Sequence, residues 1–343
     1  MNIPAFLNTV TSTARSVPIV ILYMTAGCNL RCITCSYREP LPNELTLKEY
    51  GRIAGELAGL GARHVVYSGG EPLLRRDLPE ICALFREHGI RQSLLTNGLL
   101  LAKRFLEVRE VFAEIIVSLD APNASTHDLI RGVRCFDQIV TGMEKVLALQ
   151  ERPTVSVRFV VQRRNFGLLE EMVEFGRKLG IDRISFLAAD VRSNAFHRDH
   201  SGPVAAQEEI ILNAAEVKEF EECVRRLVRN RADEFRSGFI AESPAKLMHL
   251  VKYFEAHLGL CDFPRNSCNA PMTSMVITST GDLLPCYFLP PFGNVRSGSL
   301  HSQINGDSIR STRDEVRAYS LDQCHRCVCT LKVSPFSALS GRV

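Results

Sequence analysis

The chain has 343 residues, enough for one large α/β unit with a smaller additional region. Its 41 basic and 38 acidic residues nearly balance, which gives no reason to expect nucleic acid or an anionic membrane as a partner. With 45% hydrophobic and 23% charged residues, the composition excludes a disordered or fibrous chain.

The twelve cysteines are many for a chain of this length. Secreted proteins use cysteines as disulfides. The apolar run VPIVILYM (17–24), however, is too short to span a bilayer and makes a poor export signal, since only one basic residue precedes it. A lipoprotein signal that ends at Cys28 is the alternative. We expect a reducing cytoplasm, where clustered cysteines bind metal.

The run 17–24 is the first predicted strand, and the stretch TAGCNLRCITCSYREP (25–40) follows it. Cys28, Cys32 and Cys35 have the spacing Cys-x3-Cys-x2-Cys within a loop-like sequence. A closed zinc site needs a fourth ligand nearby, but the next cysteine is Cys82, in a helical pattern. Three thiolates alone are typical of a 4Fe-4S cluster with one open iron. A chance group of core cysteines is the alternative.

Thr46 and Glu49 predict a capping box for a helix that stops at Gly61. The run RHVVYS (63–68) predicts a second, buried strand, which ends in Gly69-Gly70-Glu71-Pro72. Glycines at this point permit the backbone to approach a ligand closely. Alone, this motif also suits a plain turn into the next helix, whose start Asp77 and Glu80 mark.

Together, the cysteine motif and the Gly-Gly-Glu-Pro loop resemble the radical S-adenosylmethionine (radical SAM) enzymes. The resemblance implies that Cys28, Cys32 and Cys35 hold a 4Fe-4S cluster whose open iron binds S-adenosylmethionine. It further implies that Gly69, Gly70 and Glu71 hold the methionine amino group. One electron from the reduced cluster then cleaves the cofactor to methionine and a 5′-deoxyadenosyl radical, which abstracts a hydrogen atom from a substrate carbon.

Four more apolar runs along the chain predict strands, at 91–98, 113–122, 154–162 and 182–190. Helical patterns lie between them, including 78–89 and 168–180, and Ser125 with Asp128 predicts a helix cap after strand four. Strands that alternate with helices favour a parallel sheet with right-handed crossovers. Six units match the partial (β/α)6 barrel of the family, with function at the carboxyl ends of the strands.

Those strand ends supply further candidates. Ser118 and Asp120 end strand four, and in similar enzymes a Ser here contacts the cofactor; loop capping is the alternative. Arg158 lies inside an apolar strand, where a charge is costly unless paired. The cofactor carboxylate is one partner for Arg158, and a salt bridge to a neighbouring helix is the alternative. Asp190, at the end of strand six, suits a substrate contact less well than a turn-forming role.

We expect three regions: a barrel core in 1–190, a helical linker in 191–260 and a cysteine-rich region in 261–343. The linker begins with an irregular connection (191–207), followed by helices at 208–231 and from Ser243-Pro244. In the last region, SMVITSTGDLLPC (274–286) predicts a hairpin that ends at Cys286, and Cys324 and Cys327 end a charged, helix-like stretch.

The tail cysteines suit a four-thiolate metal site, with a structural zinc ribbon as the alternative. The spacing of Cys268, Gly281 and Cys286 resembles the start of a SPASM domain, which holds two auxiliary 4Fe-4S clusters. Too few cysteines follow for two clusters, so the one-cluster "twitch" variant is the closer match. The resemblance implies Cys268, Cys286, Cys324 and Cys327 as ligands. Cys329 is an alternative to either of the last two, and Cys261 is either an alternative to Cys268 or a bystander.

We therefore expect a radical SAM enzyme with one auxiliary cluster and a flavodoxin- or ferredoxin-type electron donor. Its expected substrate is a small hydroxylated molecule, such as a sugar, aminocyclitol or nucleoside. Only about 16 residues precede the first strand, too few for a fused peptide-recognition domain. A peptide-modifying maturase is the alternative, and an electron carrier or zinc module is a remote one. Whether the reaction is an oxidation, a decarboxylation or an epimerisation stays open.

Overall fold

The computed structural model describes residues 11–108, 110–191 and 209–334, together with Pro4, Leu7, Asn8, Ser193 and Ala195. Within these residues, a nine-stranded sheet has the order β6-β5-β4-β3-β2-β1-β7-β8-β9. Its strands are β1 Ile19–Tyr23, β2 His64–Ser68, β3 Arg91–Thr96, β4 Phe112–Ser118, β5 Thr154–Val161, β6 Arg183–Ala188, β7 Ser274–Ile277, β8 Asp282–Leu284 and β9 Gly293–Asn294.

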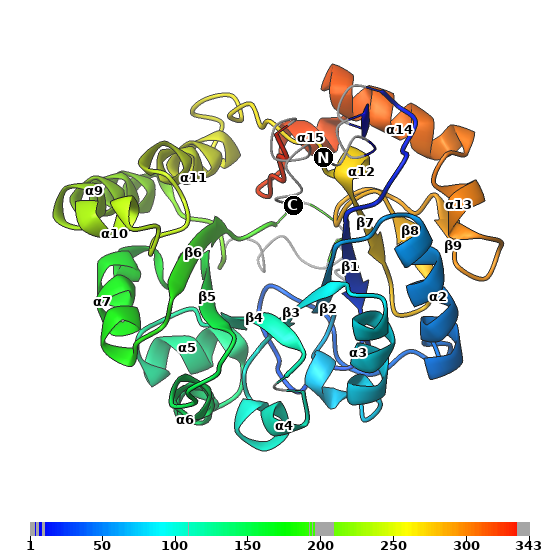
Figure 1. Ribbon diagram of the computed structural model, residues 1–343. Coiled ribbons are helices and arrows are strands. Elements are labelled where there is room, and N and C mark those ends of the chain that lie inside the picture. Colours follow the sequence, from blue (N-terminus) through cyan, green and yellow to red (C-terminus); the bar gives the residue numbers. More distant parts are fainter. Residues whose placement is uncertain are drawn as a thin grey trace.

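Strands β1 to β6 pair in parallel in chain order and form the arc in Figure 1. Helices fill the connections and lie on the outer side of this arc: α2 Leu47–Gly59, α3 Leu78–Glu87, α4 Leu101–Val108, α5 Ala124–Arg131, α6 Phe136–Leu147 and α7 Leu169–Leu179, with 3-10 turns η1 Pro72–Leu74 and η2 Phe166–Leu168. The predicted partial (β/α)6 barrel is confirmed.

Alternation along the strands gives the sheet two different faces. Leu22 of β1, Tyr67 of β2 and Phe159 of β5 belong to the large core cluster that packs under the helices. Ile21 and Tyr23 point the other way and belong to a separate cluster with Val276 of β7. This second, concave face is therefore available to build a site inside the arc.

The cysteine-rich tail continues the barrel sheet. β7 pairs in parallel with β1 along Ile19–Leu22, and β8 and β9 follow in antiparallel pairing. The predicted hairpin is confirmed, although β8 ends at Leu284, two residues before Cys286. The division into regions at 190 and 260 stays a prediction, and the sheet runs across it.

The remaining helices lie beyond the two ends of the arc (Figure 1). Beside β6 lie α9 Ala214–Asn230, α10 Ala232–Arg236 and α11 Pro244–His257; the tail carries α12 Ala270–Thr273, α13 Leu300–Gln303, α14 Asp307–Ala318 and α15 Asp322–His325. The helix expected from residue 208 begins at Ala214, because Asn213 and Glu216 form a capping box there. The connection predicted at 191–207 lies largely outside the described residues.

Helix starts follow local capping chemistry, with one correction. The capping box of Thr46 and Glu49 and the N-cap at Ser243 are confirmed. The cap predicted from Ser125 and Asp128 is wrong: Asn123 caps α5, and its side-chain oxygen accepts from the Thr126 amide at 3.0 Å. Asn123 is the cap because it is the residue directly before the helix, where its short side chain reaches a free amide of the first turn.

The charged stretch before Cys324 is also not one helix. It breaks at Tyr319, which has a left-handed φ of 56°, and α15 starts again at Asp322. In the described part of the chain, no helix has the length and apolar composition needed to cross a membrane.

Candidate functional site

The loop after β1 brings the three predicted cysteines together. All three cysteines are half-buried, and none of them forms a disulfide. The Cys28 amide donates to the Arg38 carbonyl at 2.9 Å, and the Cys35 amide donates to the Cys32 carbonyl at 3.3 Å. Burial first, then the nearby Cys32 and Cys28, raise the pKa of Cys35 to about 11. A thiol with this pKa is protonated at neutral pH, and metal binding would release its proton.

The Gly-Gly-Glu-Pro loop packs directly on the segment that precedes Cys28. The Gly70 amide donates to the Thr25 carbonyl and the Glu71 amide to the Gly27 carbonyl, both at 2.8 Å. A Cβ atom on Gly70 would lie 2.0 Å from the Gly27 carbonyl oxygen, so only glycine fits there. Gly69 precedes it directly after β2. The sequence predicted that these glycines let the backbone approach a ligand. In the structure, the backbone that approaches them closely is that of the cysteine loop.

The side chain of Glu71 links the Gly-Gly-Glu-Pro loop to the end of β3. Its side chain is fully buried, and its carboxylate accepts from the Leu73 amide at 3.0 Å, the Thr96 hydroxyl at 2.8 Å and the Asn97 amide at 2.8 Å. Burial raises the pKa of Glu71 to about 7, although these hydrogen bonds oppose the rise. The Asn97 side chain in turn lies 3.8 Å from the Cys28 sulfur.

Ser118 and Arg158 lie opposite each other in the β4–β5 register. Val157 and Phe159, on either side of Arg158, belong to the helix-facing core, so Arg158 points into the concave face. Its Nε atom is buried and has no hydrogen-bond partner among the described residues. Burial raises the pKa values of Tyr287 and Cys329, and the positive charge of Arg158 lowers both. Arg158 therefore lies close to the tail.

The two aspartates at the strand ends hold local structure. Asp120 is buried, accepts from the Val160 amide at 2.9 Å and pairs with Arg131 at 2.6 Å. Asp190 accepts hydrogen bonds from the backbone and hydroxyl of Ser193, as expected for a turn-forming residue.

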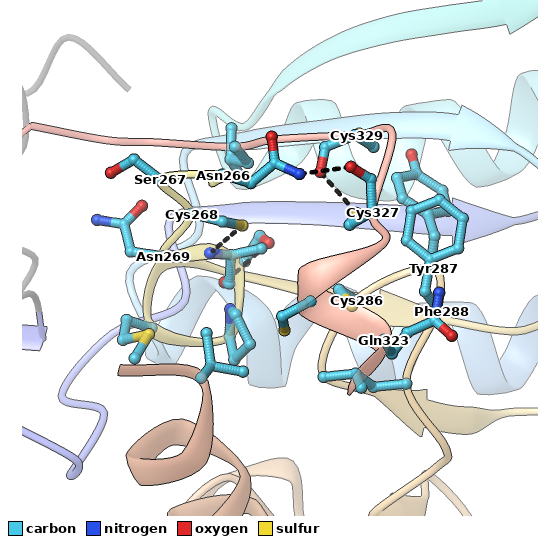
Figure 2. A pocket seen from close by; sticks show the side chains of 18 of the residues that line it. Asn266, Ser267, Cys268, Asn269, Cys286, Tyr287, Phe288, Gln323, Cys327 and Cys329 are labelled. Atoms are coloured by element: carbon cyan, nitrogen blue, oxygen red, sulfur yellow. Dashed lines mark hydrogen bonds between the residues drawn. The ribbon is translucent and has the colours of Figure 1, made fainter. Parts of the chain in front are cut away.

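The tail contains a cavity of about 400 Å³ whose wall carries five thiols (Figure 2): Cys268, Cys286, Cys324, Cys327 and Cys329. Cys261 does not line it; this residue is exposed, and its sulfur lies 3.7 Å from the Lys252 carbonyl. In the described chain, no three of the cavity thiols have all their sulfurs within 4.8 Å of one another.

Three tyrosines connect the two groups of cysteines. Tyr37, two residues after Cys35, contacts Tyr23 of β1 edge to face at 6.1 Å between ring centroids. Tyr23 stacks on Tyr287 at 6.0 Å, and Tyr287 follows Cys286 and lines the tail cavity. The sequence places two of these rings beside site cysteines, but no signal in it indicated that they meet through Tyr23.

Known proteins match both cysteine groups. The family model of the radical SAM superfamily matches residues 22–176, and that of the SPASM iron–sulfur cluster-binding domain matches residues 268–328. The AdoMet-dependent heme synthase of Methanosarcina barkeri is 29% identical over 85% of this chain and 83% of its own length. A probable GTP 3′,8-cyclase of Methanococcus maripaludis is 30% identical over 64% of this chain and 74% of its own length.

A shorter match is higher in identity. The Fe-coproporphyrin III synthase of Methanosarcina barkeri is 35% identical over 45% of this chain, which spans 41% of that relative's length. Among solved structures, Streptococcus suis SuiB bound to S-adenosylmethionine has a TM-score of 0.65 and 19% identity over 95% of this chain and 77% of its own. SuiB has also been solved bound to its precursor peptide SuiA. At this identity the likeness shows the fold alone.

Proposed function

Because the chain belongs to the radical SAM superfamily and is an enzyme with S-adenosylmethionine and iron–sulfur cofactors, we propose that Cys28, Cys32 and Cys35 hold its radical-forming cluster. When bound, the reduced cluster cleaves S-adenosylmethionine and supplies the radical that abstracts a hydrogen atom from the substrate. The three thiols fit this group, since they share one loop and Asn97 points a donor at one of them.

The neighbouring residues suit the cofactor itself. The loop of Gly69, Gly70 and Glu71 binds the methionine amino group, and the buried carboxylate of Glu71 keeps that loop in place through its three hydrogen bonds. Ser118 and Arg158 bind the carboxylate from the concave face. The buried Arg158 Nε, without a partner in the described chain, supports this assignment because an unsatisfied guanidinium donor is costly.

One observation carries the proposal for the tail: a cavity lined by five thiols that also reaches Ile21 of β1 and Val276 of β7, on the inner face of the sheet. Cys268, Cys286, Cys324 and Cys327 hold one auxiliary 4Fe-4S cluster, and Cys329 is the possible replacement. The exposed position of Cys261 argues against its being a ligand. A substrate inside the arc would lie between the two clusters.

A small molecule is the substrate class that the relatives support. The names of the heme synthase and of the GTP cyclase describe reactions on small molecules. Peptide modification is the second candidate, favoured by the SuiB structure with its precursor peptide, but that likeness concerns the fold. The remote alternatives, an electron carrier or a zinc module, would have no need for a cofactor-binding Gly-Gly-Glu loop packed against the cysteine loop.

The test is substrate-stimulated cleavage of S-adenosylmethionine by the anaerobically reconstituted, reduced enzyme. We expect 5′-deoxyadenosine to form faster when a pool of metabolites below ~1 kDa is added than when a peptide pool is added. The reason is that the radical is consumed when it abstracts a hydrogen atom from a bound substrate. Stimulation by peptides alone would favour the maturase, and no cleavage under any condition would contradict the proposed function.

A further inference from the structure

Arg131 lies between a carboxylate and one of the barrel cysteines. It is the last residue of α5, and its side chain is only 12% exposed. One guanidinium nitrogen, Nη2, lies 2.6 Å from Asp120 Oδ2, and the other, Nη1, lies 3.8 Å from the Cys32 sulfur, within hydrogen-bond distance for sulfur. Nothing in the cysteine motif itself indicated this contact, since 99 residues separate the two side chains.

The end of α5 is docked on the cysteine loop by backbone contacts. The Arg31 amide donates to the Arg131 carbonyl at 2.9 Å, and the Ile33 amide donates to the Ile130 carbonyl at 3.1 Å. Gly132 ends the helix with a φ of 69°, and a Cβ atom there would lie 2.4 Å from the Arg31 carbonyl oxygen. The helix end and the loop therefore form one rigid contact, and Arg131 cannot simply move away from Cys32.

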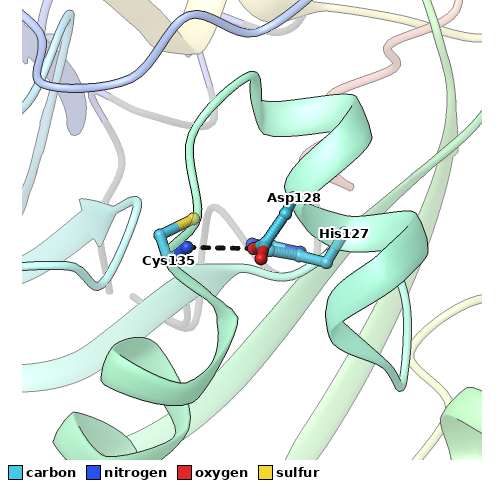
Figure 3. Close-up of side chains that lie close together, drawn as sticks. All are labelled: His127, Asp128 and Cys135. Carbon is cyan, nitrogen blue, oxygen red and sulfur yellow. Dashed lines mark hydrogen bonds between the residues drawn. The ribbon is translucent and has the colours of Figure 1, made fainter.

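A second set of contacts joins α5 to the end of β4 through His127 and to the start of α6 through Asp128, and Figure 3 shows Asp128 beside His127 and Cys135. His127 Nδ1 accepts from the Asp120 amide at 3.2 Å, and Asp128 accepts from the amides of Cys135 and Phe136 at 3.0 and 2.9 Å. The ligand atoms of His127, Asp128 and Cys135 lie within 4.8 Å of one another, as in a metal site.

We assign that group a structural role instead. His127 Nδ1 already accepts from the Asp120 amide, and the nearby positive charge of Arg131 would repel a cation. Asp128 already accepts two backbone hydrogen bonds. The group thus holds the turn that carries Arg131, and Arg131 and Asp120 keep their relative positions.

We propose that Arg131 is a positioning residue that raises the reduction potential of the cluster held by Cys28, Cys32 and Cys35. This inference rests on the proposed function of those cysteines. Reduction adds negative charge to the cluster and its thiolates, and a hydrogen bond from a buried cation stabilises the reduced state more than the oxidised one. Asn97 offers a neutral donor to Cys28 at the same distance of 3.8 Å. Of these two side-chain donors to the cysteine sulfurs, Arg131 is the charged one.

Asp120 moderates this effect. Its carboxylate partly cancels the charge of Arg131, so the ion pair presents its positive end to Cys32. Removing Arg131 must therefore lower the potential, whereas neutralising Asp120 must raise it. A merely structural contact predicts no such opposite pair of shifts. Asp120→Asn removes the negative charge and keeps one oxygen that can accept from the Val160 amide.

The experiment is a redox titration of the reconstituted full-length enzyme by electron paramagnetic resonance. It follows the signal that changes on addition of S-adenosylmethionine, which belongs to the cofactor-binding cluster. For Arg131→Met we expect an about tenfold lower ratio of reduced to oxidised cluster at a fixed potential, or ~59 mV for one electron. Asp120→Asn should move the ratio in the opposite direction. Arg131→Lys keeps the charge and should lie between wild type and Arg131→Met. Arg52→Met, which removes a charge from a surface pair, should match wild type.

Unshifted titrations in both variants, or shifts of the same sign, would overturn the inference. If Arg131→Met retains too little iron to titrate, Asp120→Asn decides alone: a raised potential supports the inference and an unchanged or lowered one overturns it. If wild type itself shows no signal that responds to S-adenosylmethionine, the proposed function fails and this inference fails with it. A responsive signal that the variants leave unshifted overturns only the role of Arg131.

Discussion

The two cysteine sites are built in different ways. The barrel site takes all three thiols from one loop between Cys28 and Cys35, directly after β1. The tail site gathers its thiols from three separated segments, at Cys268, at Cys286 and at 324–329. In the barrel, therefore, the spacing along the chain is enough to predict that the three thiols share one loop. In the tail, only the fold decides which thiols share a cavity, and it leaves Cys261 outside.

The contrast extends to what surrounds the sulfurs. The barrel loop is held by backbone hydrogen bonds from Gly70 and Glu71, and two side-chain donors point at its thiols. The tail cavity lies against the inner face of β1 and β7, with Tyr287 between it and the barrel. The first arrangement suits a cluster whose electronic state is controlled, and the second suits a cluster placed beside a substrate. The following predictions test this division of roles.

The largest effect is expected from the barrel cysteines. Replacing Cys28, Cys32 and Cys35 with Ala should abolish formation of 5′-deoxyadenosine, because the radical-forming cluster loses every protein ligand, and should leave the tail cluster in place. Chromatography of the reaction products checks this. Cys223→Ala, on helix α9, is the matched control and should retain activity. Undiminished cleavage in the triple variant would remove the barrel assignment.

The tail cysteines should affect the outcome of the reaction rather than its start. If the auxiliary cluster accepts an electron from the substrate radical, Cys324→Ala with Cys327→Ala should still form 5′-deoxyadenosine but no oxidised product. Both compounds are measured in one reaction with the substrate. Cys261→Ala, outside the cavity, should behave like wild type. Oxidised product at the normal rate in the double variant would favour a structural tail and a redox-neutral reaction.

Glu71 should give the barrel site a pH-dependent stability. Burial raises its pKa from 4.5 to about 7, so the folded chain binds this proton more tightly than the unfolded chain does. Its contribution to the free energy of unfolding is full below pH 4.5 and is lost as the pH rises through 7.

Between pH 5 and 8 the unfolding free energy of wild type should therefore fall by about 2–3 kcal/mol more than that of Glu71→Gln, which does not titrate. Urea titrations of both proteins at each pH measure the difference. Parallel pH profiles would mean that the Glu71 carboxyl ionises normally in the folded chain.

A smaller effect is expected from Arg158. If its guanidinium binds the cofactor carboxylate, Arg158→Ala should weaken S-adenosylmethionine binding by about 1.5–3 kcal/mol, the range for a hydrogen bond to a charged group. Cluster iron should stay unchanged. Arg163→Ala, which alters a surface ion pair just after β5, is the control. Unchanged cofactor affinity in a folded Arg158→Ala variant would return this residue to a structural role.

The sequence predicted the barrel well because each of its signals is local. Buried parallel strands are continuous apolar runs, so the run at 154–162 corresponds closely to β5 Thr154–Val161. Capping residues such as Thr46 marked helix starts for the same reason. The pairing of β7 with β1 joins residues about 250 positions apart, and no local pattern specifies such a partner.

The same limit applies to the sites. Cys28, Cys32 and Cys35 were predicted from their spacing, and the Gly-Gly-Glu loop from its place after a strand. The contact of Arg131 with Cys32 was not predicted, because it depends on how the end of α5 docks on the cysteine loop. The tyrosine contacts and the position of Cys261 depend on the packed tail in the same way.

Iron and acid-labile sulfide analysis of the anaerobically reconstituted protein tests the two-site account most directly. The account predicts about eight irons per chain in wild type, taking four per cubane cluster, and about four in either the barrel triple variant or a variant lacking the five cavity cysteines. About four irons with one zinc in wild type would contradict it, since the tail would then be a zinc site.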